Sequence, residues 1–244
     1  YEYTSPEAGM ADYRLYAGKP VVIKPKSTNF GLGITILKHN YDETDFKAAL
    51  QIAFEHDNTV LIEKFIPGRE FRIFIINDEV VGILHRVPAN VTGDGVLNIG
   101  QLIDMKNEDP LRGKGYRTPL EKIRKGREEE MFLKQQGMDF NTVPKEREVV
   151  YLRENSNIST GGDSIDFTDD IDDSYKAIAV EAAKALNVKI TGLDMMIQDI
   201  HAPATPDNYA IIEMNFNPAI HIHCYPFKGK NRHLNHKMIK ALGF

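Results

Sequence analysis

The stretch Ile211-Ile212-Glu213-Met214-Asn215-Phe216-Asn217-Pro218 decides how the rest of the chain is interpreted. It begins as an apolar strand and ends in a polar turn. Glu213 and Asn215 are two residues apart, so on a strand their side chains project from the same face. A carboxylate and an amide oxygen on one face suit a hard cation such as Mg²⁺. A buried strand that merely ends in polar residues would show the same pattern.

A second carboxylate lies on the preceding strand. Residues 191–197 form an apolar run that is interrupted by Asp194, and a loop at 201–208 leads into the Glu213 strand. Two consecutive strands joined by a short hairpin can present Asp194 and Glu213 to one pocket. Because a buried carboxylate without a partner is costly, a cation shared by the two carboxylates explains both residues.

A lysine followed by a glycine-containing loop lies near the start of the chain. The short buried strand 21–23 delivers Lys24, and the loop 27–33, with Gly31 and Gly33, leads into a second strand at 34–37. This arrangement matches neither the Walker loop nor the dinucleotide-binding fingerprint, because both of those lead into a helix. A hairpin loop can still bind phosphates through its N–H groups, although most glycine loops are only turns.

Apolar periodicity predicts a chain of mixed helices and strands. Helices are expected at 5–16, 42–54, 119–136 and 175–186, and strands at 59–66, 70–76, 80–86, 148–152 and 191–197. The segments 89–104 and 155–163 are expected to be loops. His221 and His223 are expected to lie on a strand, and with Cys224 they could suggest zinc, but no second ligand cluster accompanies them.

The composition is that of an ordinary globular protein. The 244 residues are 42% hydrophobic and 27% charged, and the net charge of −5 disfavours general binding of nucleic acid or of a membrane surface. No apolar run approaches the ~20 residues that a membrane span needs. The single cysteine, Cys224, excludes an internal disulfide and is consistent with a reducing cytoplasm. Since the chain does not begin with methionine, we expect a fragment of a longer protein.

The order of these motifs resembles the ATP-grasp superfamily of carboxylate–amine ligases. The resemblance implies an α+β ATP-grasp fold, in which two α/β lobes with mainly antiparallel sheets clamp ATP. The first lobe would occupy residues 1–65, incomplete at its N-terminus. The second lobe, with the metal and substrate site, would occupy residues 66–244.

The resemblance also implies roles for individual residues. In this superfamily a strand lysine and a glycine loop hold the phosphates, a backbone hinge holds adenine, a glutamate binds ribose, and acidic residues bind two Mg²⁺ (or Mn²⁺) ions. The matching residues, in that order, are Lys24 with Lys26, Gly31 and Gly33; Glu63, Lys64, Phe65 and Ile66; Glu70; and Asp194, Glu213 and Asn215.

A narrower resemblance points to one branch of the superfamily, which holds cyanophycin synthetases and the C-terminal half of bacterial bifunctional glutamate–cysteine ligase/glutathione synthetases. It rests on residues 86–95, residues 152–162 and the His223…Pro226…Gly229 tail. The cyanophycin-type pattern has a glycine near Ala219 and an arginine near His221, so the glutathione enzyme is the better match. Cyanophycin-like ligation of amino acids and a non-catalytic ATP-binding fragment stay open as alternatives.

The resemblance implies that ATP phosphorylates γ-glutamylcysteine and that glycine then attacks the acyl phosphate. The longer protein would be cytoplasmic and would carry an N-terminal glutamate–cysteine ligase domain. Arg86 and Arg153 are the catalytic candidates, because a guanidinium can neutralise phosphate charge or bind an acyl phosphate bidentately. A surface ion pair is the alternative for Arg153. Candidate substrate residues are Asn157, Ser159 and Thr160, whose loop could also be a plain surface turn, and His223.

Overall fold

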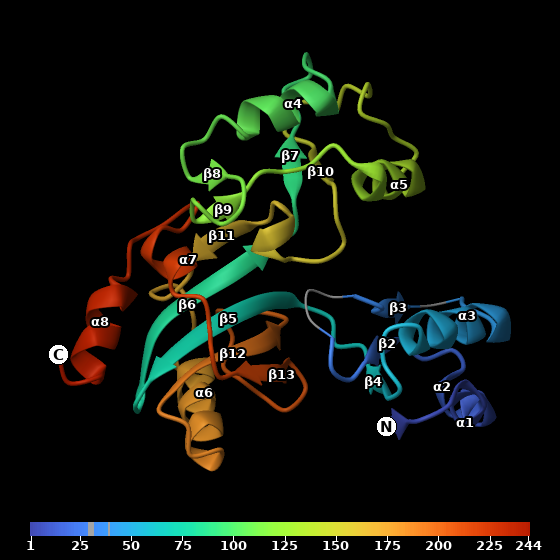
Figure 1. The fold of residues 1–244 in the computed structure, drawn as a ribbon, viewed down its shortest axis with the longest axis horizontal. Helices are drawn as coiled ribbons and strands as arrows, with labels where there is room; N and C mark the ends of the chain where they lie inside the picture. Colours follow the sequence, from blue (N-terminus) through green and yellow to red (C-terminus); the bar gives the residue numbers. More distant parts are fainter. Residues whose placement is uncertain (29–31, 39) are drawn as a thin grey trace. The chain divides into compact units, whose positions relative to one another are not determined.

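The computed structural model describes residues 1–28, 32–38 and 40–244, which form two compact units, Tyr1–Ile66 and Pro67–Phe244 (Figure 1). The sequence predicted a division between residues 65 and 66, and the assignment of the two units to the two ATP-grasp lobes stays a prediction. Gly31 of the predicted phosphate loop lies outside the described residues.

Within its described residues, the first unit is an antiparallel sheet with the strand order β1-β4-β2-β3 and three helices. Its strands are β1 (Glu2–Tyr3), β2 (Val21–Pro25), β3 (Thr35–Leu37) and β4 (Val60–Lys64), and its helices are α1 (Pro6–Ala11), α2 (Tyr13–Tyr16) and α3 (Glu43–Phe54). The single helix predicted at 5–16 is therefore wrong, because α1 ends at a non-helical Asp12. The predicted caps Ser5 and Asp42 are confirmed, since each accepts a hydrogen bond from a backbone N–H of the first turn.

The core of the first unit follows the predicted periodicities. Alternate residues of β2 and β4, including Ile23 and Ile62, are buried. They pack against Phe46, Leu50 and Ala53, which form the apolar face of α3.

The second unit is built on an antiparallel sheet with the order β11-β6-β5-β12-β13. Its strands are β5 (Arg69–Ile76), β6 (Glu79–Val87), β11 (Asp163–Asp166), β12 (Ile190–Ile197) and β13 (Tyr209–Asn215). Helix α6 (Asp173–Ala185) covers one face, while α7 (His221–Cys224) and α8 (Leu234–Ala241) cover part of the other face (Figure 1). The two faces are set by alternation along β5, because Ile73 packs with α6 and Phe74 packs with α7 and α8.

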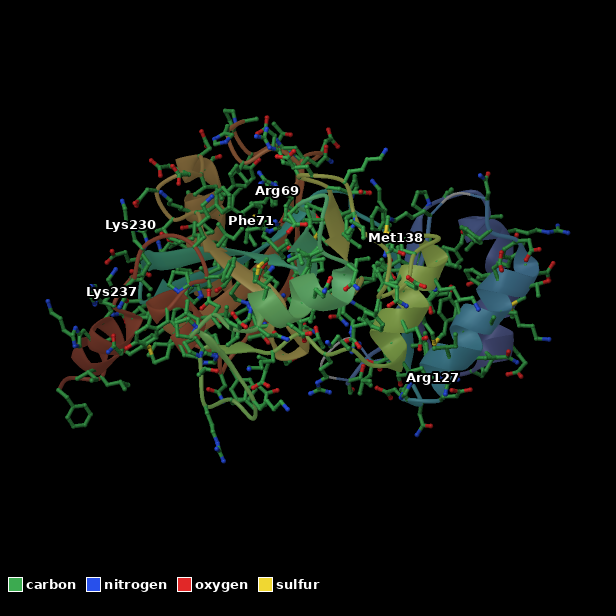
Figure 2. All side chains as sticks on the ribbon, turned by 90° about the horizontal axis from the view of Figure 1, so that it is seen from above. Arg69, Phe71, Arg127, Met138, Lys230 and Lys237 are labelled. Atoms are coloured by element: carbon green, nitrogen blue, oxygen red, sulfur yellow. The ribbon has the colours of Figure 1, made fainter. Side chains whose placement is uncertain are left out.

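Further elements of the second unit surround a smaller apolar cluster. They are β7 (Asn90–Thr92), α4 (Ile99–Lys106), β8 (Arg112–Gly113), β9 (Leu120–Glu121), α5 (Arg127–Gln135), β10 (Val149–Tyr151) and the 3-10 turn η1 (Ile158–Thr160). Figure 2 labels Arg69 at the start of β5 beside Phe71, and the guanidinium carbon lies 5.5 Å from the ring centroid. None of the helices in the described ranges is both long and apolar enough to cross a membrane.

Besides the single helix at 5–16, three further expectations about local structure are wrong. The loop expected at 89–104 contains β7 and α4, and α4 begins with a reciprocal cap between Asn98 and Gln101. The helix expected at 119–136 begins only at Arg127, because the segment before it forms β9. His221 lies on a short helix and not on a strand, since β13 ends at Asn215 and Pro218 cannot donate to a ladder.

Candidate functional site

Charged side chains gather on the face of the five-stranded sheet that lies opposite α6. Phe71 points toward the α6 core, so Glu70 and Arg72, its neighbours on β5, project from the opposite face. Arg72 lies directly across from Asp194 of β12, and Asp194 lies across from Glu213 of β13. We define the Asp194 cluster as Glu70, Arg72, Arg86 and Asp194.

Asp194 is the centre of this cluster and is only 2% exposed. Arg72 binds both of its carboxylate oxygens, with Nη2 2.7 Å from Oδ2, and Nη2 of Arg86 donates to Oδ2 at 3.0 Å. Burial by itself raises the pKa of Asp194, but the hydrogen bond from Arg72 and the charges of both arginines lower it below its ordinary value overall. Asp194 is therefore a carboxylate at neutral pH.

Glu70, the predicted ribose ligand, already has two side-chain partners in this structure. It forms an ion pair with Arg86, and Oγ of Ser156 donates to its Oε2 at 2.6 Å. Glu70 therefore links the loop after β10 to the Asp194 cluster. Its role in ribose binding stays a prediction.

Glu213, which is exposed, and Asn215, which is half-buried, supply the remaining part of the predicted metal site. Nδ2 of Asn215 donates to Oε1 of Glu213 at 3.1 Å, which leaves the amide oxygen of Asn215 as an acceptor. With the ionised Asp194 beside them, these residues offer two carboxylates and one amide oxygen, a donor set that fits Mg²⁺ or Mn²⁺. Across the described residues, no three His, Cys, Asp or Glu side chains gather as a metal site.

The predicted phosphate residues of the first unit lie on β2 and in the loop that follows it. Nζ of Lys24 is 2.6 Å from Oε2 of Glu63 on the paired strand β4, and Nζ of Lys26 is 2.9 Å from Oε1 of Glu2. Gly33 has φ +76°, and a Cβ there would lie 2.7 Å from the ring of Pro25. Glycine is therefore required at this point of the loop.

The predicted adenine hinge follows β4 directly. The backbone N–H of Phe65 donates to the carbonyl oxygen of Pro20 at 3.0 Å, which ties the hinge to the segment before β2. Lys64 is exposed, whereas Phe65 and Ile66 are half-buried. Recognition of adenine by Glu63, Lys64, Phe65 and Ile66 stays a prediction.

Arg153 lies in a different set of contacts from Arg86. Its Nε donates to Oε1 of Glu129 at 2.7 Å, and its Nη2 also pairs with Glu128, so the first turn of α5 holds the guanidinium. The sequence left open a surface ion pair as the alternative for Arg153, and the observed pair differs because the side chain of Glu129 is buried. A role in binding the acyl phosphate stays a prediction.

The three predicted loop residues lie in and next to the turn η1. Oγ1 of Thr160 donates to Oδ1 of Asn155 at 3.0 Å and to the carbonyl oxygen of Asn157 at 2.9 Å. Ser159 is half-buried in the same turn. The structure therefore brings Asn157, Ser159 and Thr160 into one small turn, and their contact with substrate stays a prediction.

His223 is fully buried, and its ring meets that of Phe74 edge-on with the centroids 5.5 Å apart. Neither ring nitrogen has a hydrogen-bond partner within the part of the chain that the structure describes. Burial lowers the pKa of His223 to about 3, so the imidazole is neutral at pH 7. Its predicted role in substrate binding stays a prediction.

Sequence reasoning missed Arg72 and Ser156. A signal for Arg72 was present, because a charged residue in an apolar strand, two positions after Glu70, must share the face of Glu70. No local signal connects Ser156 to Glu70, because these residues are 86 positions apart and meet only in the folded protein.

The chain is similar to several known proteins. A family model described as "D-ala D-ala ligase C-terminus" matches residues 5–101. The "Glutathione biosynthesis bifunctional protein" of Desulfotalea psychrophila is 62% identical over 242 residues, which are 99% of this chain and 31% of that protein. The protein of the same name from Clostridium perfringens is 55% identical over 241 residues, again 99% of this chain and 31% of that protein.

A solved structure is similar over the same range. The crystal structure of a bifunctional glutathione synthetase from Pasteurella multocida matches with a TM-score of 0.73 and 48% identity, over 99% of this chain and 33% of that one. The chain thus spans about one third of the length of these relatives. Motif order, antiparallel sheets and relatives together confirm the predicted α+β ATP-grasp fold, and the chain is similar over 99% of its length to these glutathione biosynthesis proteins.

Proposed function

We propose that this chain is the part of a ligase that uses ATP to join γ-glutamylcysteine to glycine through an acyl phosphate, with glutathione as the product. The observation that carries the proposal is the Asp194 cluster beside Glu213 and Asn215, where ionised oxygens for a cation lie next to two arginines. The names of relatives that are similar over 99% of the chain support glutathione as the product.

In this proposal Asp194, Glu213 and Asn215 hold Mg²⁺ or Mn²⁺. When bound, the ion neutralises phosphate charge and orients the phosphates of ATP. Arg72 fixes the Asp194 carboxylate in its ionised form, because the guanidinium contacts both oxygens. Arg86 supplies a second positive charge beside the same carboxylate.

Each predicted nucleotide residue keeps its assigned role in this proposal. Lys24, Lys26 and the loop with Gly31 and Gly33 bind the phosphates. The backbone at Glu63, Lys64, Phe65 and Ile66 binds adenine, and Glu70 binds ribose. Lys24 is paired with Glu63 and Glu70 is paired with Arg86 in this structure, so ATP would replace these ion pairs with its own contacts.

The reaction needs positioning and charge neutralisation more than proton transfer. A carboxylate oxygen of γ-glutamylcysteine attacks the γ-phosphorus of ATP, and the bond to the β–γ bridging oxygen breaks, which releases ADP. The amine of glycine then attacks the acyl carbon, the bond to the phosphate oxygen breaks, and the amine loses a proton. Arg153 stabilises the acyl phosphate. The loop residues Asn157, Ser159 and Thr160 bind the amine acceptor, and His223 contributes to substrate binding.

We also propose that the chain is joined to a glutamate–cysteine ligase domain in a longer, cytoplasmic protein. The word "bifunctional" in the names of the relatives and the coverage of 31% of their length support this proposal. The first domain would then make the γ-glutamylcysteine that this chain consumes.

The test is an assay of the full-length protein that carries this chain, with Mg·ATP, γ-glutamylcysteine and glycine, in which ADP and glutathione are both measured. We expect equal amounts of the two products, and neither product when one substrate is omitted. Product formation with aspartate and arginine instead would support the cyanophycin-like alternative. Binding of ATP without any ligation would support a non-catalytic nucleotide-binding module.

A further inference from the structure

A second buried group of charges in the second unit lies outside the site described above. We define the Asp163 cluster as Asn90, Lys106, Arg112 and Asp163. Arg112 binds Oδ1 of Asp163, Nζ of Lys106 lies 2.7 Å from Oδ2, and Nδ2 of Asn90 lies 2.9 Å from Oδ2. The side chains of Asp163 and Arg112 are 5% and 0% exposed, so the ion pair is removed from water.

The ring of Phe227 lies against both cations of the Asp163 cluster. The ring centroid lies 5.1 Å from Nζ of Lys106 and 5.4 Å from the guanidinium carbon of Arg112, which are distances of cation–π contacts. Burial lowers the pKa of Lys106, and the neighbouring Asp163 partly offsets this effect. Buried ion pairs give little net stability compared with apolar packing. We therefore expect the Asp163 cluster to have a role other than stabilisation of the fold.

Arg112 connects the cluster to the turn that carries the candidate substrate residues. Its Nη1 donates to the carbonyl oxygen of Gly161 at 3.0 Å and to that of Glu121 at 2.9 Å. Gly161 has φ +93°, and a Cβ there would lie 2.8 Å from Cα of Ile123. The end of the turn is therefore pressed against the segment after β9 and fixed there by Arg112.

Hydrogen bonds within the turn fix the backbone that carries the candidate substrate side chains. The carbonyl oxygen of Asn157 accepts the N–H groups of Thr160 and Gly162, both at 3.2 Å. At the other end, Ser156 is held by Glu70 at 2.6 Å. Asn157, Ser159 and Thr160 thus lie between two anchors, one on the Asp194 cluster and one on the Asp163 cluster.

We propose that Arg112 is a positioning residue that sets the turn 157–161 in the conformation that binds the amine acceptor. This inference rests on the proposed function, in which the acceptor is glycine. Lysine cannot replace arginine here, because a single ammonium group cannot reach Gly161, Glu121 and Asp163 at once.

The chain offers a matched control on the same strand. Asp166 of β11 is also a buried carboxylate, and Arg232 binds it with Nε 3.0 Å from Oδ1 and 2.9 Å from Oδ2. Arg232 also pairs with Asp169, and its contacts hold the segment before α8. Arg232→Lys therefore weakens a similar ion pair that serves a different part of the fold.

The experiment compares Arg112→Lys and Arg232→Lys with the wild type in the full-length protein. In Arg112→Lys we expect KM for glycine to rise about tenfold, as the loss of hydrogen bonds from a charged donor predicts. KM for ATP and kcat at saturating glycine should change less than about twofold in this variant. Hydrogen exchange of amides 157–162 should become about tenfold faster in Arg112→Lys and stay unchanged in Arg232→Lys.

The results separate this inference from the proposed function. Absence of glutathione formation by the wild type overturns the proposed function, while hydrogen exchange still decides whether Arg112 anchors the turn. Equal effects of the two lysine variants on KM for glycine, or a fall in kcat with KM unchanged, overturn the positioning role. If Arg112→Lys does not fold, Asp163→Asn, which keeps the size of the side chain, is expected to show the same selective rise in KM.

Discussion

The Asp194 cluster and the Asp163 cluster are chemically alike, because each buries one carboxylate between two cationic side chains. They differ in what lies beside them. The Asp194 cluster adjoins Glu213, whose side chain is exposed, whereas Phe227 lies over both cations of the Asp163 cluster. A buried charge therefore does not by itself mark a reaction site. The exposed Glu213, which belongs to the proposed cation site, distinguishes the first cluster, and the contacts with backbone carbonyls distinguish the second.

The largest expected effect comes from removing the carboxylate of each cluster. Asp194→Ala and Asp163→Ala each leave buried cations uncompensated, so each should lower the free energy of unfolding by about 3–5 kcal/mol. Urea unfolding of the two variants measures this cost. Turnover should vanish in Asp194→Ala, whereas Asp163→Ala should keep most of its kcat and bind glycine more weakly. Equal losses of kcat would remove the functional difference between the clusters.

The next effect concerns the exposed neighbour of the Asp194 cluster. Glu213→Gln keeps the shape of the side chain and removes one negative charge from the proposed cation site, so kcat should fall about a hundredfold or more, equivalent to about 2.7 kcal/mol in the barrier. Steady-state kinetics over a Mg²⁺ titration measures the loss. Glu181→Gln, on the exposed face of α6, is the matched control and should leave kcat unchanged. A folded Glu213→Gln variant with nearly normal kcat would contradict the metal assignment.

A smaller effect is expected from the buried His223, which belongs to neither cluster. It concerns the dependence of stability on pH. The folded-state pKa of His223 is about 3, below the ordinary value of 6.5, so the unfolded state binds more protons between these values. Stability should therefore fall as pH decreases below 6.5, by about 2 kcal/mol between pH 7 and pH 5 for this group. The pKa of Asp194 is lowered from its ordinary value of 3.8, so this carboxylate stays ionised between pH 5 and pH 7.

Unfolding of His223→Leu between pH 5 and pH 7 tests this assignment. The variant should lose about 2 kcal/mol of the pH dependence, because leucine has no proton to bind. His201→Leu, at an exposed position, serves as the control. An unchanged slope in His223→Leu would show that other groups cause the acid sensitivity.

The smallest expected effect concerns the nucleotide side of the Asp194 cluster. If Glu70 binds the ribose hydroxyls, ATP should bind about tenfold more tightly than 2′-deoxy-ATP, since a hydrogen bond to a charged group contributes about 1.5 kcal/mol or more. Glu70→Ala should remove this preference, while Ser156→Ala, which removes only the neighbouring hydroxyl, should keep it. Calorimetric titration with both nucleotides measures the difference, and equal affinities in the wild type would rule out the ribose contact.

The sequence by itself determined which residues share a strand face and which strands follow one another. The spacing of Glu213 and Asn215 and the hairpin from Asp194 to Glu213 were visible in the sequence, because strand alternation and short connections are local properties. The same local logic predicted the apolar face of α3 and the caps at Ser5 and Asp42. The motif order was sufficient to indicate the ATP-grasp fold, which the structure and the relatives confirm.

Only the tertiary structure decided which distant side chains meet. Arg72 and Asp194 are 122 residues apart, and they form a pair because β5 and β12 are neighbours in the order β11-β6-β5-β12-β13. Arg112 reaches Gly161 across 49 residues for a similar reason, because the segment after β9 packs against the turn before β11. A periodic pattern specifies the face on which a side chain lies, but the sheet order and the packing of loops decide which partner it finds there.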